Sequence, residues 1–227
     1  MSSDEPSGPV DTFPVPERLE GRAVDPAGDR ALLGYAVADD LALHYAPHEV
    51  MMLALTGRPP SSEEGLAVGA AITWVATPHA GEGPAHAAVL ARISGAPIEG
   101  LLQAANTAAA VEGSAVVERQ APLLDWLDAG RPDPAPRLAG ASSRWSRRLA
   151  GTCSHPCPGL EAVASAEEAF LVVAHACGLR EREQLVALWS WARSIGALAE
   201  GLRARALAFR EYPLRLPRYR YAEEVEK

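Results

Sequence analysis

Residues 181–210 read EREQLVALWSWARSIGALAEGLRARALAFR. Apolar residues recur three and four positions apart through this stretch, which is the spacing of one face of an α-helix. The residues on this face are Leu185, Leu188, Ala192, Ile195, Ala199, Leu202, Ala206 and Phe209. The pattern predicts one long helix whose apolar face packs either on the chain's own core or on a helix of a partner chain.

An arginine interrupts this apolar stretch. Arg193 lies between Trp191 and Ile195, and a charge buried there needs an opposite charge because its desolvation is costly. Two interpretations follow from the sequence. Either an Asp or Glu of the same chain pairs with Arg193, or Arg193 binds an anionic ligand.

Signals for the beginning and end of helices recur before this stretch. Pro47 is suited to begin a helix that ends at Gly57, and a turn is expected at residues 58–60. Ser61 with Glu64 forms a capping-box pattern, as do Ser165 and Glu168 further along the chain.

Other helices are predicted from apolar spacing and from prolines and glycines at their ends. The first runs from Pro84 to Ile93. The second begins at Pro97, with Ile98, Leu101, Leu102 and Ala105 facing inward. A third runs from about Ser114 to Leu127, and a fourth from Ser142 to Leu149. No strand pattern of useful length is present. The predicted fold class is therefore all-α.

The domain organisation follows from two segments rich in proline, glycine and charge. Residues 1–30 are predicted to be a flexible N-terminal arm, and residues 31–227 a helical domain with a linker at about residues 129–140. The linker suggests a large and a small helical lobe.

Composition and charge exclude several functional classes. The 29 acidic residues outnumber the 21 Lys and Arg residues and give a net charge of −8, so nucleic-acid binding has no electrostatic support. No apolar stretch reaches the length needed to span a membrane, and no signal peptide is evident. Three cysteines, an odd number, argue against a disulfide framework. We expect a cytoplasmic protein.

Motifs for nucleophilic catalysis, nucleotide binding and metal binding are absent or incomplete. There is no Gly-x-Ser-x-Gly and no glycine-rich phosphate loop. Cys153, His155 and Cys157 would be cramped as ligands of one metal, and no fourth ligand is obvious. We expect no metal site.

Several segments, in order, resemble the citrate synthase and citryl-CoA lyase superfamily. His48-Glu-Val-Met-Met-Leu-Ala-Leu-Thr-Gly-Arg-Pro-Pro60 resembles a family helix that ends in Leu-x-Gly-x-x-Pro. Thr77-Pro-His-Ala-Gly81 resembles the family's His-Gly loop, and Ala192-Arg193-Ser-Ile-Gly196 its Ala-Arg-x-x-Gly helix. Leu214-Arg-Leu-Pro-Arg218 with Tyr221 resembles its Arg-Pro-x-x-x-Tyr tail. The resemblance covers roughly residues 30–225, with a gap at the linker.

The resemblance implies a shortened citrate synthase-like fold that dimerises. Members of the family make or cleave a carbon–carbon bond between an acyl-CoA and a 2-oxo dicarboxylate. They hold no permanently bound cofactor, and a coenzyme A thioester is their co-substrate.

The resemblance also assigns roles to individual residues, and here the chain departs from the family pattern. His155 matches the second catalytic His, whereas Glu112 stands where the family has its first. The catalytic Asp has no counterpart, because Gly178 runs almost directly into the helix at Glu181. The resulting assignments are catalytic roles for His155 and Glu112, and substrate binding by Arg193, Arg218, Arg215 and His79.

Three hypotheses of function follow. The first is a degenerate, non-catalytic or accessory subunit that forms a homodimer or pairs with a complete paralogue, with a dicarboxylate or an acyl-CoA as its ligand. The second is an active condensing enzyme or lyase with a divergent substrate that uses His155, Glu112 and Arg193. The third is a helical scaffold without a ligand.

Overall fold

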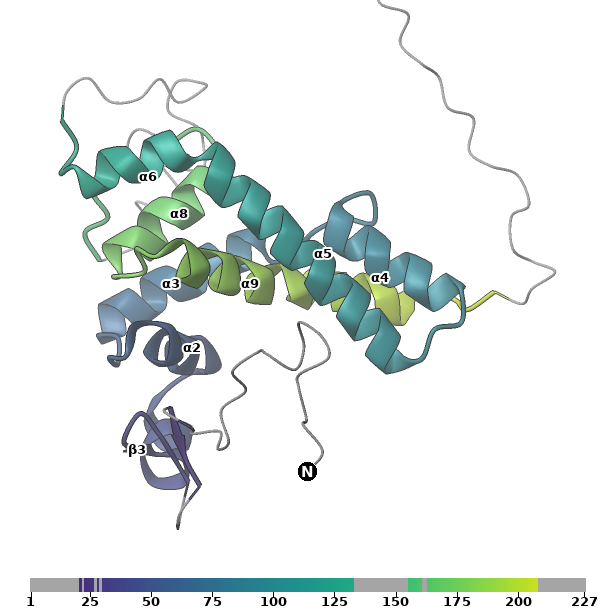
Figure 1. Ribbon diagram of the computed structural model, residues 1–227, viewed down its shortest axis with the longest axis horizontal. Coiled ribbons are helices and arrows are strands. Elements are labelled where there is room, and N and C mark those ends of the chain that lie inside the picture. The colour runs from purple at the N-terminus through teal and green to yellow at the C-terminus, as the bar shows by residue number, and fades with distance from the viewer. Residues whose placement is uncertain are drawn as a thin grey trace, which may run out of the picture. The chain divides into compact units, whose positions relative to one another are not determined.

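The computed structural model describes residues 21, 23–26, 28, 30–132, 155–160 and 163–207 (Figure 1). The chain divides into two compact units, residues 1–59 and 60–227, and the boundary along the sequence falls where a turn was expected, at residues 58–60. The predicted arm lies largely outside the described residues. The predicted linker is described only to Pro132, and the predicted helix Ser142–Leu149 is not described.

The first unit contains a small antiparallel sheet followed by short helices. The strands β1 (Val24–Asp25), β2 (Ala31–Leu32) and β3 (Tyr35–Ala36) pair in that order. Leu33 and Gly34 both have positive φ, of 52° and 88°, as the tight turn between β2 and β3 requires. These strands were not predicted from the sequence, because two residues are too few to show an alternating pattern.

The described residues that follow β3 in the first unit are mainly helical. A single π-helical segment, η1 (Val37–Leu41), leads into α1 (Ala42–His44) and then α2 (Pro47–Thr56). Pro47 occupies the first turn of α2, and Gly57 ends the helix in the left-handed conformation with φ of 76°. Both predicted ends of this helix are confirmed.

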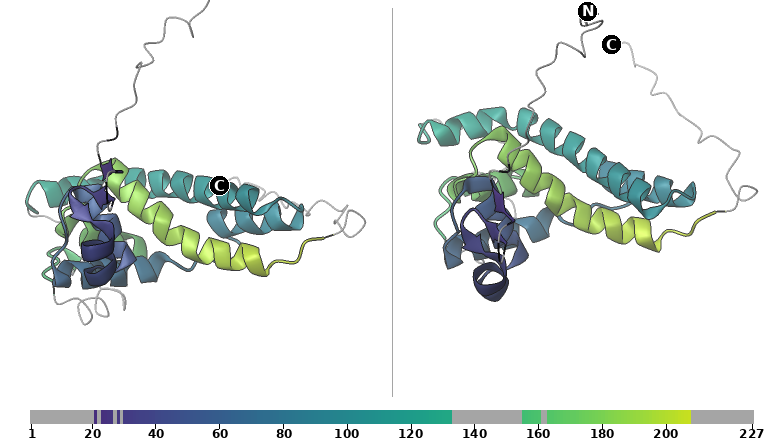
Figure 2. Two further views of the ribbon diagram at one scale, coloured as in Figure 1. Left: turned by 90° about the horizontal axis from the view of Figure 1, so that it is seen from below. Right: turned by 60° about the horizontal axis from the view of Figure 1, so that its bottom comes forward.

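The described part of the second unit is built from helices. They are α3 (Ser62–Val75), α4 (Gly83–Ile93), α5 (Ile98–Arg119), α6 (Ala121–Asp128), α8 (Ala166–Ala176) and α9 (Arg182–Arg203). Helix α9 packs against α3, α4 and α5, while α8 packs against α3 and α6. Figure 2 shows α5 and α9 running side by side along much of their lengths. The mostly helical architecture confirms the predicted all-α fold class.

Both predicted capping boxes are present. Ser61 Oγ accepts from Glu64 N at 3.2 Å, and Ser61 N donates to Glu64 Oε2 at 2.8 Å. Ser165 and Glu168 repeat this arrangement at the beginning of α8. Each pair satisfies backbone N–H groups that the first helical turn would otherwise leave without partners.

Two helices were predicted between Pro97 and Leu127, but the predicted position of the break between them was wrong. Helix α5 is continuous from Ile98 to Arg119, and the chain breaks only at Gln120 before α6. The alanine-rich residues 104–110 have high helix propensity and carry α5 through the expected gap. Leu101 and Ala105 are buried as predicted, whereas Ile98 is exposed.

Helix α9 was predicted to reach residue 210 but ends at Arg203. Beyond it, Leu207 N donates to the carbonyl of Ile93 at 3.3 Å, so a tertiary contact overrides the local helix propensity. The first half of the predicted apolar face is buried, but Ile195 and Leu202 are exposed. Ala197 and Gly201 face the core in their place.

Small residues bring α9 close to its neighbours. A Cβ added at Gly196 would lie 2.4 Å from the Ala76 carbonyl oxygen and 2.7 Å from Pro78 Cδ. A Cβ at Gly201 would lie 2.9 Å from Ala88 Cβ. The contact at Gly196 places this turn of α9 directly against the end of α3, and Arg193 lies one turn earlier.

Candidate functional site

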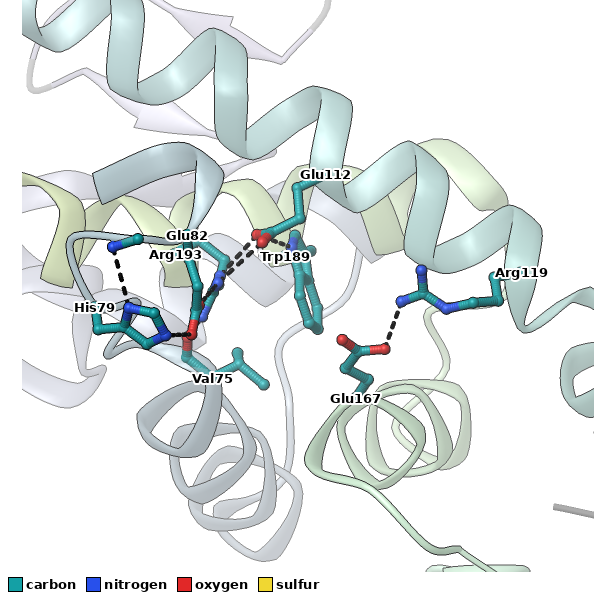
Figure 3. Close-up of polar contacts among 9 residues, drawn as sticks. Val75, His79, Glu82, Glu112, Arg119, Glu167, Trp189 and Arg193 are labelled. Carbon is teal, nitrogen blue, oxygen red and sulfur yellow. Dashed lines mark hydrogen bonds and ion pairs between the residues drawn. The ribbon is translucent and has the colours of Figure 1, made fainter. Parts of the chain in front are cut away.

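Arg193 is the centre of a buried polar cluster in the second unit. Its side chain is only 10% exposed. Its Nε donates to Glu112 Oε2 at 2.7 Å, and its Nη2 donates to Glu112 Oε1 at 2.9 Å (Figure 3). This is the two-pronged geometry in which a guanidinium binds a carboxylate most strongly.

Two further contacts connect Arg193 to other elements. Its Nη1 donates to the carbonyl oxygen of Val75 at 3.0 Å, at the C-terminal end of α3. Its Nη2 also donates to Glu82 Oε2, at the beginning of α4. Arg193 thereby joins α9 to α3, α4 and α5 through one side chain.

The charge state of Arg193 follows from these contacts. Burial by itself would lower the pKa of the guanidinium, because a cation loses solvation inside the protein. The hydrogen bonds from Arg193 to Glu112 and Glu82, and the attraction to both carboxylates, outweigh burial and raise the pKa above its ordinary value. Arg193 is therefore charged throughout the neutral range.

Trp189 completes the surroundings of Glu112. The indole Nε1 donates to Glu112 Oε2 at 3.1 Å, and the Arg193 Cζ lies 5.7 Å from the centroid of the indole ring. Gly113 makes room for this ring, since a Cβ there would lie 2.9 Å from Trp189 Cδ1. Three N–H donors thus engage the two oxygens of the Glu112 carboxylate.

Glu82 connects this buried cluster to the surface. Its Oε1 lies 3.2 Å from His79 Nε2, and the backbone N–H of Gly81 donates to His79 Nδ1 at 3.0 Å. Because Nδ1 accepts a bond, Nε2 carries the ring proton and donates it to Glu82. The side chain of His79 is 75% exposed and that of Glu82 is 36% exposed.

A pocket of about 320 Å³ opens beside the cluster. It is lined by Trp74, Val75, Glu82, Glu112, Ala166, Glu167, Trp189 and Arg193. Glu167 also pairs with Arg119 at 2.6 Å, on the other side of Trp189 in Figure 3. Three carboxylates and one guanidinium line the pocket, so its formal charge is −2.

A second hollow, of about 490 Å³, lies between α5 and α9. Its lining is mostly small or apolar, with Ala110, Val117 and Val186 among its residues. Charged groups occur there only as Glu118, Arg182 and Glu183 among the described residues. The hollow lacks a converging set of polar groups, so the Arg193 pocket is the better candidate site.

The structure brings some of the predicted site residues together. Glu112 and Arg193 contact each other directly, and His79 reaches Arg193 through Glu82. His155 is half-buried and is not among the described residues that line the pocket. Arg215 and Arg218 lie outside the described residues.

Of the two interpretations of Arg193, the structure contains the internal pairing with carboxylates. Glu82 and Trp189 were not predicted from the sequence as site residues. Trp189 is four positions before Arg193 and therefore shares its face of the helix, which was a usable signal. Glu82 follows the predicted loop residue His79 by three positions, but nothing in the sequence indicated that its side chain would point toward Arg193.

The structure gives no indication of a metal centre in the residues it describes. No group of three His, Cys, Asp or Glu side chains there is arranged to bind a metal. Cys157 and Cys177, the cysteines within the described ranges, form no disulfide bond. Cys153 lies outside those ranges.

Comparisons with known proteins bear on the fold. No protein-family model matches the sequence, and no curated protein matches it significantly. Among solved structures, citryl-CoA lyase from Hydrogenobacter thermophilus matches with a TM-score of 0.63 over 92% of this chain and 98% of that chain. The two sequences are 15% identical.

The chain has the citrate synthase and citryl-CoA lyase fold. The match at nearly full length of both chains confirms the resemblance predicted from the sequence at the level of the fold. Within the described residues, no helix combines the length and the apolar character needed to cross a bilayer.

Proposed function

We propose that this chain is a degenerate member of the citrate synthase and citryl-CoA lyase superfamily that acts as an accessory, non-catalytic subunit. The observation that carries the proposal is the internal pairing of Arg193 with Glu112 and Glu82. A guanidinium that would bind a substrate carboxylate in a family enzyme is already neutralised by carboxylates of its own chain.

The state of Glu112 supports the same proposal. A general base needs a lone pair directed at the proton that it removes. The oxygens of Glu112 accept from Arg193 Nε, Arg193 Nη2 and Trp189 Nε1. A carboxylate held in this way is suited to fixing helix α5 on α9 rather than to proton transfer.

The charge of the pocket is the third support. Oxaloacetate, citrate and coenzyme A esters are all anionic, and the pocket has a formal charge of −2 from three glutamates and Arg193. Like charges brought together in a partly desolvated site repel one another.

The missing catalytic groups are a separate support. The family's catalytic Asp has no counterpart here, and Glu112 stands where the family has its first catalytic His. Loss of a positioned acid or base lowers the rate of catalysis by ~10²–10⁴-fold each.

The test is to measure turnover and binding with the purified full-length chain. Cleavage of citryl-CoA to acetyl-CoA and oxaloacetate, and condensation of acetyl-CoA with oxaloacetate, are assayed beside an authentic citryl-CoA lyase and an authentic citrate synthase. We expect no turnover above background, and calorimetry with oxaloacetate, citrate and coenzyme A to show no binding tighter than ~1 mM. Measurable turnover would contradict the non-catalytic role, and tight binding of all three compounds would contradict the expected repulsion of anions from the pocket.

The accessory role has its own experiment. The chain is mixed with a complete citrate synthase or citryl-CoA lyase from the same source, and the masses of intact complexes are measured by native mass spectrometry. A heteromer with altered activity of the complete enzyme is the expected result. If the chain forms only a homodimer and does not bind the complete enzyme, the result argues against the accessory role.

An active acyl-CoA condensing enzyme or lyase with a divergent substrate is the alternative. It is favoured by the presence of Glu112 and Arg193 in the lining of one pocket. This alternative uses His155 as the second catalytic group. If a thioester activity is found and His155→Ala leaves it unchanged, that assignment fails.

A further inference from the structure

Glu112 and Glu82 bind the same guanidinium in different ways. Glu112 projects from the 22-residue helix α5, is 26% exposed and is also held by Trp189. Glu82 stands at the end of a surface loop, and its second oxygen is held by His79, which is largely exposed. Of the two carboxylates, Glu82 is the one that can leave without disturbing a long helix.

The position of Glu82 in the chain gives a second reason. Glu82 is the N-cap residue of α4, where Ser, Thr, Asp and Asn are favoured because their short side chains bond to the first turn. The Glu82 side chain makes no such bond and turns to Arg193 instead. The backbone around it is anchored independently, by Glu82 N to the carbonyl of His79 and by His86 N to the carbonyl of Glu82, both at 2.8 Å.

We propose that the Nη2 edge of Arg193 is a carboxylate-binding site that Glu82 closes from within the chain, and that a small free monocarboxylate can occupy this site once the Glu82 carboxylate has left it. The site opens on a pocket of about 320 Å³, which is ample for such a molecule. This inference does not depend on whether the chain has thioester activity.

The charges around Arg193 define the class of ligand. Exchange of the Glu82 carboxylate for a single free carboxylate leaves the charge of the pocket unchanged. A dicarboxylate or tricarboxylate would add negative charge next to Glu112 and Glu167, which line the same pocket. The site is therefore selective for compact molecules with one carboxylate.

The test uses Glu82→Ser in the full-length chain, because serine is a good N-cap residue and preserves α4 while removing the carboxylate. Melting temperatures are compared in sodium acetate and in sodium chloride at equal ionic strength and neutral pH. If acetate binds with a Kd of ~10 mM, about 100 mM acetate raises the melting temperature of the variant by about 3–6 °C over chloride. The wild-type chain, with its site filled by Glu82, shifts by less than about 1 °C.

Matched controls separate a carboxylate site from general salt effects. Acetamide, which has the shape of acetate but no charge, produces no shift in Glu82→Ser. Succinate at the same concentration produces a smaller shift than acetate. Glu118→Ser, which removes an exposed carboxylate on α5, shows no difference between acetate and chloride. Glu82→Gln fills the site with a neutral amide and shows less than half the acetate shift of Glu82→Ser.

Equal melting temperatures of Glu82→Ser in acetate and chloride overturn the inference. If this variant does not fold in chloride, its helical circular dichroism is measured in acetate and in acetamide. Recovery in acetate alone supports the site, and failure in acetate overturns it. Thioester turnover by the wild-type chain would contradict the proposed function and leave the acetate shift as it is, so the two failures are distinguishable.

Discussion

Two arginine–glutamate pairs border the same pocket and differ in burial far more than in chemistry. The Arg193 side chain is 10% exposed and donates to groups on three other elements. The Arg119 side chain is 56% exposed and pairs with Glu167 alone at 2.6 Å among the described contacts. Water competes for the second pair and screens it, but it scarcely reaches the first. The two pairs are therefore expected to contribute unequally to stability.

Replacement of the buried arginine is expected to have the largest effect. Arg193→Met keeps the apolar length of the side chain but removes the cation and the Arg193 hydrogen bonds to Glu112, Glu82 and the Val75 carbonyl. We expect the free energy of unfolding in urea to fall by about 3–5 kcal/mol.

The control for this variant removes the stranded charges as well. Arg193→Met combined with Glu112→Gln and Glu82→Gln should recover part of the lost stability, because no unpaired carboxylate is left in the cluster. A triple variant no more stable than the single one would show that the carboxylates left without their cation are not the source of the loss.

The close contact beside Arg193 gives the next largest effect. In Gly196→Ala the new methyl group meets the Ala76 carbonyl oxygen at 2.4 Å, so α9 must move away from the end of α3. We expect a loss of about 2–4 kcal/mol in urea denaturation. Gly100→Ala is the matched control, since its Cβ would meet nothing closer than 3.4 Å, and it should be neutral or slightly stabilising. Equal losses in the two variants would refute the packing argument.

The indole bond to Glu112 is a smaller part of the same cluster. Trp189→Phe keeps an aromatic ring between α5 and α9 but removes the Nε1–H that donates to Glu112. The expected loss is about 1 kcal/mol by thermal or urea unfolding. Trp126→Phe removes an exposed indole bond to the Pro132 carbonyl and should cost less, which sharpens the distinction between buried and exposed donors.

The exposed pair should show the smallest effect. Arg119→Ala is expected to cost about 0–1 kcal/mol. The difference from wild type should shrink further when the ionic strength is raised, because salt screens exposed charges. A loss as large as that of Arg193→Met, or one that is insensitive to salt, would break the comparison between the two pairs.

The sequence predicted local features well and long-range partners poorly. The capping boxes at Ser61 and Ser165 and the glycine end of α2 depend on residues within four positions of each other, and all three are confirmed. The end of α9 was missed because Leu207 bonds to Ile93 in a distant element. Only the tertiary fold determines such a contact.

The candidate site shows the same division. The apolar pattern around Arg193 correctly predicted that the charge would be buried and would need a partner. The partners of Arg193 could not be predicted from the neighbouring sequence, since Glu112 is 81 and Glu82 is 111 positions away. The resemblance pointed to Glu112 as a departure from the family pattern, and the structure adds that this departure coincides with the Arg193 pair.

The contacts of Arg193 also bear on the kinetics of folding. Its partners Glu112, Glu82 and Val75 are 81, 111 and 118 positions away in sequence. Each contact closes a long loop, and such contacts lose much chain entropy before they add stability. The cluster is therefore expected to form after the folding transition state. In that case, substitutions at Arg193 mainly accelerate unfolding and leave the refolding rate nearly unchanged.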